Sequence, residues 1–92
     1  MPIVSNTSPI LSLSFVGLLE LLQIQFTEVN IPSAVYDEFK LDLGYPGTNS
    51  ISKAIDIGWL KVVQLKNNEV AKVLSIELDY GESEAIALTL EN

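Results

Sequence analysis

Six residues in three separate segments carry side chains that could bind a divalent cation: Asn6, Asp37, Glu38, Asp79, Glu82 and Glu84. Their carboxylate and amide oxygens are hard ligands, which suit Mg2+ or Mn2+ with several waters retained. Two carboxylates about 4 Å apart repel by roughly 4 kcal/mol at an effective dielectric constant of 20, and a cation relieves that repulsion. Water bound to such a cation can attack a phosphodiester.

Each of these residues also has a purely structural explanation. Asn6 follows a β-branched run and can simply end a strand, while residues 37–38 suit the solvated face of a helix. Asp79, Glu82 and Glu84 suit a helix N-terminus, where negative charge interacts favourably with the macrodipole. Because Glu82 and Glu84 are two positions apart, they cannot share one face of a helix. Spacing alone leaves both explanations open.

The composition removes several other kinds of chemistry. The chain has no cysteine and no histidine, which excludes disulfides, thiolate zinc sites, cysteine nucleophiles, imidazole ligands and Ser-His-Asp catalysis. Five lysines, no arginine and twelve acidic residues give a net charge of −7, which argues against non-specific nucleic-acid binding by this chain alone. No segment has the length of a membrane span and the first residues do not resemble a signal peptide, so we expect a cytoplasmic protein.

The apolar residues that would position these side chains make up 48% of the chain, enough for the core of one small domain over residues 1–92. Their pattern predicts strands over residues 3–5, 26–31 and 59–65, and helices over residues 9–15, 18–22, 33–41, 51–57, 70–78 and 82–90. The candidate helix caps are Thr7 or Ser8, Ser50, Asn67 or Asn68, and Gly58 as a C-terminal stop. This order predicts an α/β fold with a parallel sheet, helices on both faces, and a ligand site beyond the carboxyl ends of the strands.

Four blocks of residues resemble the PIN-domain superfamily. They are residues 4–10 (Val-Ser-Asn-Thr-Ser-Pro-Ile), 31–39 (Ile-Pro-Ser-Ala-Val-Tyr-Asp-Glu-Phe), 58–60 (Gly-Trp-Leu) and 78–88 (Leu-Asp-Tyr-Gly-Glu-Ser-Glu-Ala-Ile-Ala-Leu). The blocks occur in the right order and span nearly the whole chain, which makes the match specific. Within the superfamily they resemble the small prokaryotic PIN-like proteins that are predicted to bind nucleic acid.

The resemblance implies a three-layer α/β/α sandwich with a short parallel sheet and a ribonuclease site that depends on Mg2+ or Mn2+. Asn6 stands at the first acidic position of the family and Glu38 at the second. Glu84 matches the third acidic position, with Glu82 as a close neighbour. Thr7 or Ser8 matches the small hydroxyl residues that flank the first ligand.

Two departures from the family pattern bear on activity. Asn6 is neutral where a carboxylate is expected, which weakens cation binding although its amide oxygen can still be a ligand. Family members also continue into a further strand, which pairs with the first strand and carries another acidic residue. We therefore expect this chain to be the N-terminal two-thirds of a PIN-like domain, lacking its last strands and leaving the first strand at a sheet edge.

The leading hypothesis is a domain related to the Mg2+- or Mn2+-dependent ribonucleases of toxin–antitoxin pairs, with impaired activity in this chain, so that enzyme activity itself stays open. The alternative is a non-catalytic module that binds a partner protein or a second copy of itself. A nucleotide-binding flavodoxin-like domain is disfavoured, because no strand precedes a glycine-rich phosphate loop. The expected partners are RNA as substrate, an antitoxin-like protein and a second copy in a homodimer, with no membrane.

Overall fold

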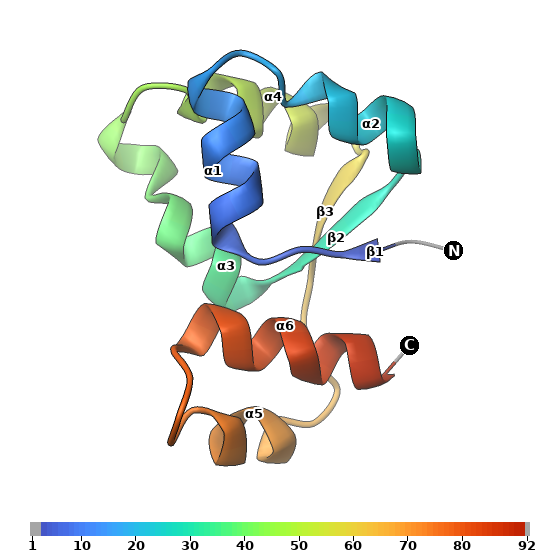
Figure 1. Cartoon of the computed structure of the whole chain (residues 1–92), viewed down its shortest axis with the longest axis vertical. Helices are drawn as coiled ribbons and strands as arrows, with labels where there is room; N and C mark the ends of the chain where they lie inside the picture. Colours follow the sequence, from blue (N-terminus) through green and yellow to red (C-terminus); the bar gives the residue numbers. More distant parts are fainter. Residues whose placement is uncertain (1–2, 92) are drawn as a thin grey trace.

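A computed structural model describes residues 3–91 of the chain, which form three short strands, six α-helices and one 3-10 helix (Figure 1). In chain order these elements are β1 (Ile3–Val4), α1 (Thr7–Phe15), α2 (Glu20–Phe26), β2 (Val29–Pro32), α3 (Ser33–Phe39), the 3-10 helix η1 (Leu41–Leu43), α4 (Thr48–Ile57), β3 (Leu60–Val63), α5 (Glu69–Leu74) and α6 (Tyr80–Glu91). The alternation of strands and helices confirms the predicted α/β class.

The three strands form one parallel sheet in the order β1-β2-β3. Val29 of β2 lies opposite Ile3 on one side and Leu60 on the other, and all four residues of β2 are buried. A parallel sheet needs cover on both faces, which explains why its central strand is apolar at three of four positions. Within the described residues β1 is an edge strand, so its outer side has no strand partner.

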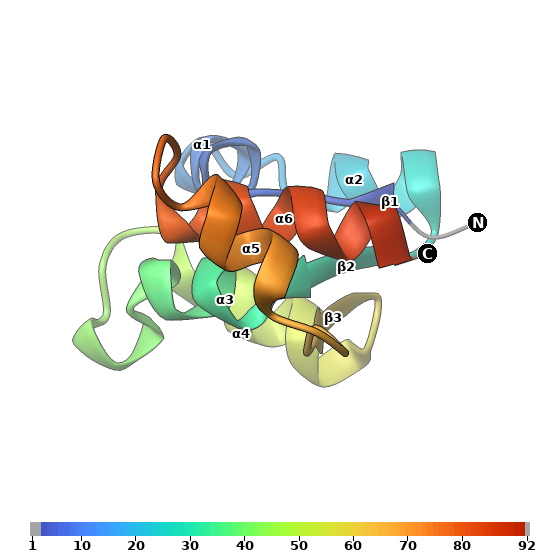
Figure 2. The ribbon, with the colours of Figure 1, turned by 90° about the horizontal axis from the view of Figure 1, so that it is seen from below.

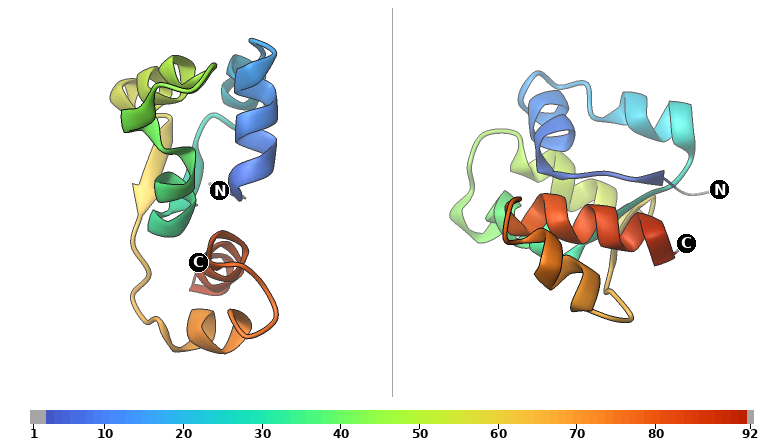
Figure 3. Two further views of the ribbon diagram at one scale, coloured as in Figure 1. Left: turned by 90° about the vertical axis from the view of Figure 1, so that its left-hand side faces the viewer. Right: turned by 60° about the horizontal axis from the view of Figure 1, so that its bottom comes forward.

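The helices lie on two sides of this sheet, as a three-layer α/β/α arrangement requires. Figure 1 shows α1, α2 and α4 on one side of the strands and α5 and α6 on the other. Figures 2 and 3 show α6 running beside β1, with α5 packed on its outer side. The helix α3 follows directly from the carboxyl end of β2 and makes its most extensive helix contact with α6. The α3–α6 contact therefore lies where the carboxyl ends of the strands open.

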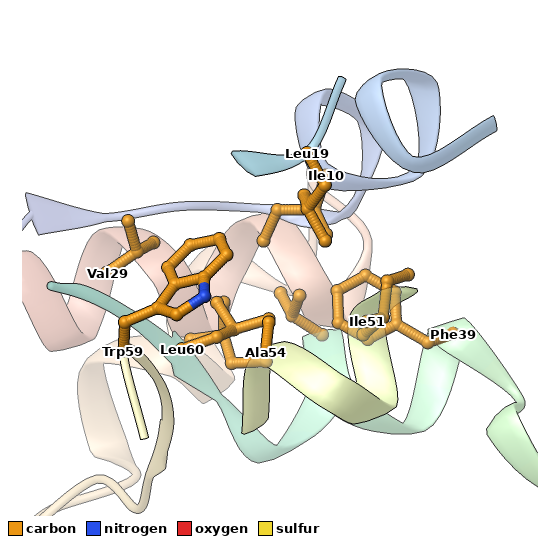
Figure 4. Close-up of a cluster of buried hydrophobic side chains, with 10 residues drawn as sticks. Ile10, Leu19, Val29, Phe39, Ile51, Ala54, Trp59 and Leu60 are labelled. Atoms are coloured by element: carbon orange, nitrogen blue, oxygen red, sulfur yellow. The ribbon is translucent and has the colours of Figure 1, made fainter. Parts of the chain in front are cut away.

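A cluster of ten buried apolar residues fills the space between the sheet and the α1, α2 and α4 layer (Figure 4). The cluster consists of Ile10, Leu19, Val29, Ile31, Val35, Phe39, Ile51, Ala54, Trp59 and Leu60. Burying a large apolar side chain stabilises a fold by about 1.5–3 kcal/mol, so this cluster fixes α1 and α3 over the sheet. It thereby sets the positions of Thr7 at the start of α1 and Glu38 near the end of α3.

Several predicted boundaries are wrong, each for a local reason. Phe26 ends α2 and does not open a strand, because the helix that begins at Glu20 continues through it before Thr27 adopts a positive φ of 66°. The helix α6 begins at Tyr80 and not at residue 82, since the side chain of Asp79 accepts a hydrogen bond from the Glu82 N–H at 2.8 Å. The helix α5 ends at Leu74, with a turn where residues 75–77 were predicted to be helical.

The predicted caps had a mixed outcome. Asn6, and neither Thr7 nor Ser8, occupies the N-cap position of α1, and α4 begins at Thr48, ahead of Ser50. The Asn67 side chain accepts a hydrogen bond from the Glu69 N–H at 2.8 Å, as an N-terminal cap would. Gly58 ends α4 in the left-handed conformation, with φ at 105°, which confirms the predicted stop. Among the described residues, no helix is both long and apolar enough to cross a membrane.

The buried cluster generates a first prediction, for the stability of the domain. We expect Leu60→Ala to lower the free energy of unfolding by about 2–5 kcal/mol, because Leu60 is fully buried and the substitution leaves a cavity in the core. Urea unfolding followed by circular dichroism measures the change. The matched control is Leu90→Ala, since Leu90 is 69% exposed on α6. Equal losses in the two variants would contradict this account of the core.

Candidate functional site

The structure places the predicted site residues on three elements near the carboxyl ends of β1 and β2. Asn6 lies two residues after the end of β1, at the N-cap of α1, and is half-buried, while Glu38 lies in the last turn of α3 and is exposed. Glu82 and Glu84 lie in the first turns of α6, the former exposed and the latter half-buried. Because α3 packs on α6, the carboxylates of Glu38 and Glu84 come from two neighbouring helices.

The Glu84 carboxylate joins α6 to the start of α3. Its Oε1 accepts a hydrogen bond from the backbone N–H of Ala34 at 3.0 Å. Ala34 is in the first turn of α3, where backbone N–H groups lack partners within the helix and the positive end of the helix dipole favours a carboxylate. Glu84 therefore has a structural role in addition to any role as a ligand.

The Glu38 carboxylate makes the reciprocal contact, from the end of α3 to the start of α6. It lies against Gly81 in the first turn of α6, so that a Cβ atom at position 81 would collide with Oε1 of Glu38. The same Cβ position is 3.4 Å from Oγ1 of Thr7. Three segments that are far apart in the sequence thus meet at one point, formed by Thr7, Glu38 and Gly81.

The hydroxyl of Thr7 is a buried polar group without a hydrogen-bond partner among the described residues. Leaving such a group unsatisfied costs about 1–3 kcal/mol, so buried hydroxyls are normally bonded to protein, water or an ion. The two hydroxyl residues that match the family pattern differ here, since Thr7 is half-buried at this point and Ser8 is exposed. The structure therefore favours Thr7 over Ser8 as the hydroxyl of the site.

Of the pockets that predicted ligands line, two each contain a pair of them. The α3–α6 pocket, of about 410 Å3, is lined by Ser33, Ala34, Asp37, Glu38, Lys40, Tyr80 and Glu84. The β1–α6 pocket, of about 370 Å3, is lined by Val4, Ser5, Asn6, Pro9, Glu82, Ala85, Ile86 and Thr89. The structure thus brings Glu38 together with Glu84, and Asn6 together with Glu82, but it does not bring all four into one pocket. Glu82 and Glu84 face different pockets, as their spacing on a helix predicts.

The donor set determines what kind of cation site these residues could form. Within residues 3–91, no group of three or more carboxylates is close enough together to hold a metal ion. Mg2+, however, is commonly held by only one or two carboxylates and keeps several of its waters. The Glu38 carboxylate beside the unsatisfied Thr7 hydroxyl, with Glu84 in the same pocket, fits such a hydrated ion and does not fit a closed cage.

Two residues of this region were not identified from the sequence as part of the site. Gly81 lies between the two helices predicted over residues 70–78 and 82–90, whereas in the structure it lies within α6 and leaves room for Glu38. Lys40 falls inside the helix predicted over residues 33–41, whereas it follows the end of α3 with a left-handed backbone, φ 50°, and lines the α3–α6 pocket. The sequence signal that could have identified Gly81 is its position directly before two closely spaced glutamates, Glu82 and Glu84.

Comparison with known proteins gives one match. Residues 2–92 match the family DUF3368, described as a PIN domain. No curated protein and no solved structure matches the chain.

The contact between Glu84 and Ala34 generates a second prediction. We expect Glu84→Ala to lower the free energy of unfolding by about 1–3 kcal/mol, because it removes a charged acceptor and leaves the Ala34 N–H without its partner. Glu82→Ala on the same helix is the control, since Glu82 is exposed. Urea unfolding measures both variants, and an unchanged stability of Glu84→Ala would show that the hydrogen bond is not maintained in solution.

Proposed function

The chain belongs to the PIN-domain family, and on that premise we propose that it is a ribonuclease domain of the toxin–antitoxin type that depends on Mg2+ or Mn2+. PIN domains generally use divalent metals, and PIN nucleases act on RNA. The observation that carries the proposal is that Glu38 and Glu84 line one pocket, and that Glu38 lies near the buried Thr7 hydroxyl, which has no partner among residues 3–91. The neutral Asn6 supports the further proposal that activity in this chain is reduced.

In this proposal Glu38 and Glu84 hold the cation, Thr7 assists beside Glu38, and Asn6 acts only from the neighbouring β1–α6 pocket. A bound divalent cation supplies an activated water for hydrolysis of an RNA phosphodiester. The residues of the chain supply position and charge: the first turn of α6 orients the Glu38 carboxylate, and the Ala34 N–H orients that of Glu84. Lys40, the one cationic residue that lines the pocket, offers a charge for an RNA phosphate. Glu82 and the Asn6 amide border the neighbouring β1–α6 pocket, where they can contact bound waters or the RNA backbone.

A third prediction tests the nuclease. We expect the chain to cleave single-stranded RNA in the presence of Mn2+ or Mg2+, and chelation by EDTA to abolish cleavage. Glu38→Gln should lower the rate about 100-fold or more, because loss of the charged oxygen weakens both cation binding and water activation. Gel analysis of an end-labelled RNA gives the rates.

Glu77→Gln is the matched control, since Glu77 is exposed and lies outside both pockets. The control should cleave at the rate of the unmodified chain. Cleavage that survives both EDTA and Glu38→Gln would come from a contaminating nuclease and would contradict the proposal, as would the absence of cleavage with either cation.

One surface favours a second function, the binding of another copy of the chain. Six large apolar side chains from the end of α1 through α2 are exposed: Phe15, Val16, Leu18, Leu21, Ile24 and Phe26. Residues 1–27 contain a single charged residue, Glu20, although the whole chain has a net charge of −7. Two such acidic chains repel unless they meet through an uncharged face, so this face, called the α1–α2 surface, suits a homodimer. An antitoxin-like protein is the competing occupant.

A fourth prediction tests that surface. We expect a dimer by light scattering at tens of micromolar, and Ile24→Lys should give a monomer, because it buries a charge in the apolar interface. Ile76→Lys is the matched control, since Ile24 and Ile76 are 79% and 78% exposed and Ile76 lies elsewhere. A monomeric unmodified chain would contradict the homodimer and leave the surface to a different protein.

A further inference from the structure

Gly81 is the one glycine whose backbone does not require glycine. The other four glycines, at positions 17, 44, 47 and 58, all have positive φ angles, which side chains disfavour. Gly81 lies in the first turn of α6, where alanine would stabilise the helix. A glycine at this position therefore needs a reason other than backbone conformation.

The reason lies in the space that a side chain would occupy. A Cβ atom at position 81 would collide with Oε1 of Glu38 and lie 3.0 Å from its Cδ. The atom met first is the far end of a flexible side chain, so a methyl group at position 81 would displace the Glu38 carboxylate and leave the helix intact. Gly81 itself is buried, and the heavy atoms nearest to this Cβ position belong to Glu38 and Thr7.

The geometry of the two helices brings Glu38 to this point. On α3, Ala34 and Glu38 are four residues apart and share a face; on α6, Gly81 and Glu84 are three apart and share a face. The 3.0 Å hydrogen bond from the Ala34 N–H to Glu84 joins the two faces at the start of α3. The contact between Glu38 and Gly81 joins them at the end of α3, beside Oγ1 of Thr7, which is unsatisfied within residues 3–91.

We propose that Gly81 is a positioning residue: its missing side chain forms a seat that holds the Glu38 carboxylate beside the Thr7 hydroxyl, in the orientation that a divalent cation needs. This inference rests on the proposed function for its metal, but the seat itself can be tested without any metal. It assigns a role to a residue that contacts neither the cation nor RNA. It also explains why the helix keeps a glycine where alanine would be more stable.

The proposal is tested by Gly81→Ala, which should weaken metal binding without lowering the stability of the domain. We expect the melting temperature to stay unchanged or to rise by up to about 8 °C, since alanine favours the helix. Binding of Mn2+, measured by calorimetry on the full chain, should weaken about 10-fold or more, because a displaced carboxylate loses its orientation. Ser52→Ala in the middle of α4 is the control for helix propensity, and it should leave Mn2+ binding unchanged.

A second measurement tests the seat alone. In a Glu38→Ala background the seat is empty, so Gly81→Ala should raise the melting temperature more than it does in the unmodified chain. Equal changes in melting temperature in the two backgrounds would contradict the proposed seat, whether or not the chain binds Mn2+. Mn2+ binding that Gly81→Ala leaves intact would overturn the positioning role. If the unmodified chain binds no Mn2+, the proposed function and the positioning role fail, while the comparison of melting temperatures still decides on the seat.

Discussion

The candidate site depends on the packing of α3 against α6. Each helix places a carboxylate at the first turn of the other: Glu84 accepts a hydrogen bond from the Ala34 N–H, and Glu38 lies against Gly81. The first turn of a helix offers unpaired N–H groups and a positive dipole end, so both contacts are favourable for an ionised carboxylate. A shift of either helix would disturb both contacts at once. The packing of α3 on α6 therefore brings the two glutamates near each other before any ligand binds.

The elements that carry this contact were predictable because their signals are local. The apolar run that ends at Ile31 and the pair Pro32-Ser33 after it predict a buried strand followed directly by a helix, and β2 and α3 confirm this. The glycine stop at the end of α4 is equally local, because only the backbone angle of Gly58 is involved. The wrong predictions are at the boundaries of helices and strands, where neighbouring residues favour different secondary structures. Phe26 prefers strands in general, yet it belongs to the helix that precedes it.

The geometry of the site was less predictable, because it depends on contacts between distant segments. Glu38 and Glu84 could be identified from the sequence as candidate ligands, and the two-residue spacing correctly separated Glu82 from Glu84. Nothing local indicates that Glu84 meets Ala34, fifty positions away, or that Asn6 borders a different pocket from Glu38. The role of Gly81 was not predictable from its neighbours in the sequence either, because it depends on the Glu38 side chain, which belongs to another helix.

Electrostatics connects the acidic composition to the proposed substrate. The lining of the α3–α6 pocket carries the carboxylates of Asp37, Glu38 and Glu84 and the ammonium group of Lys40, a formal net charge of −2. Among the described residues one ion pair is formed, between Glu28 and Lys61, so the charges of this pocket are not neutralised by salt bridges of their own. An RNA phosphate would be repelled from such a pocket, whereas one divalent cation would make it formally neutral. Cation and RNA should therefore bind with positive coupling, each raising the affinity for the other by the same factor.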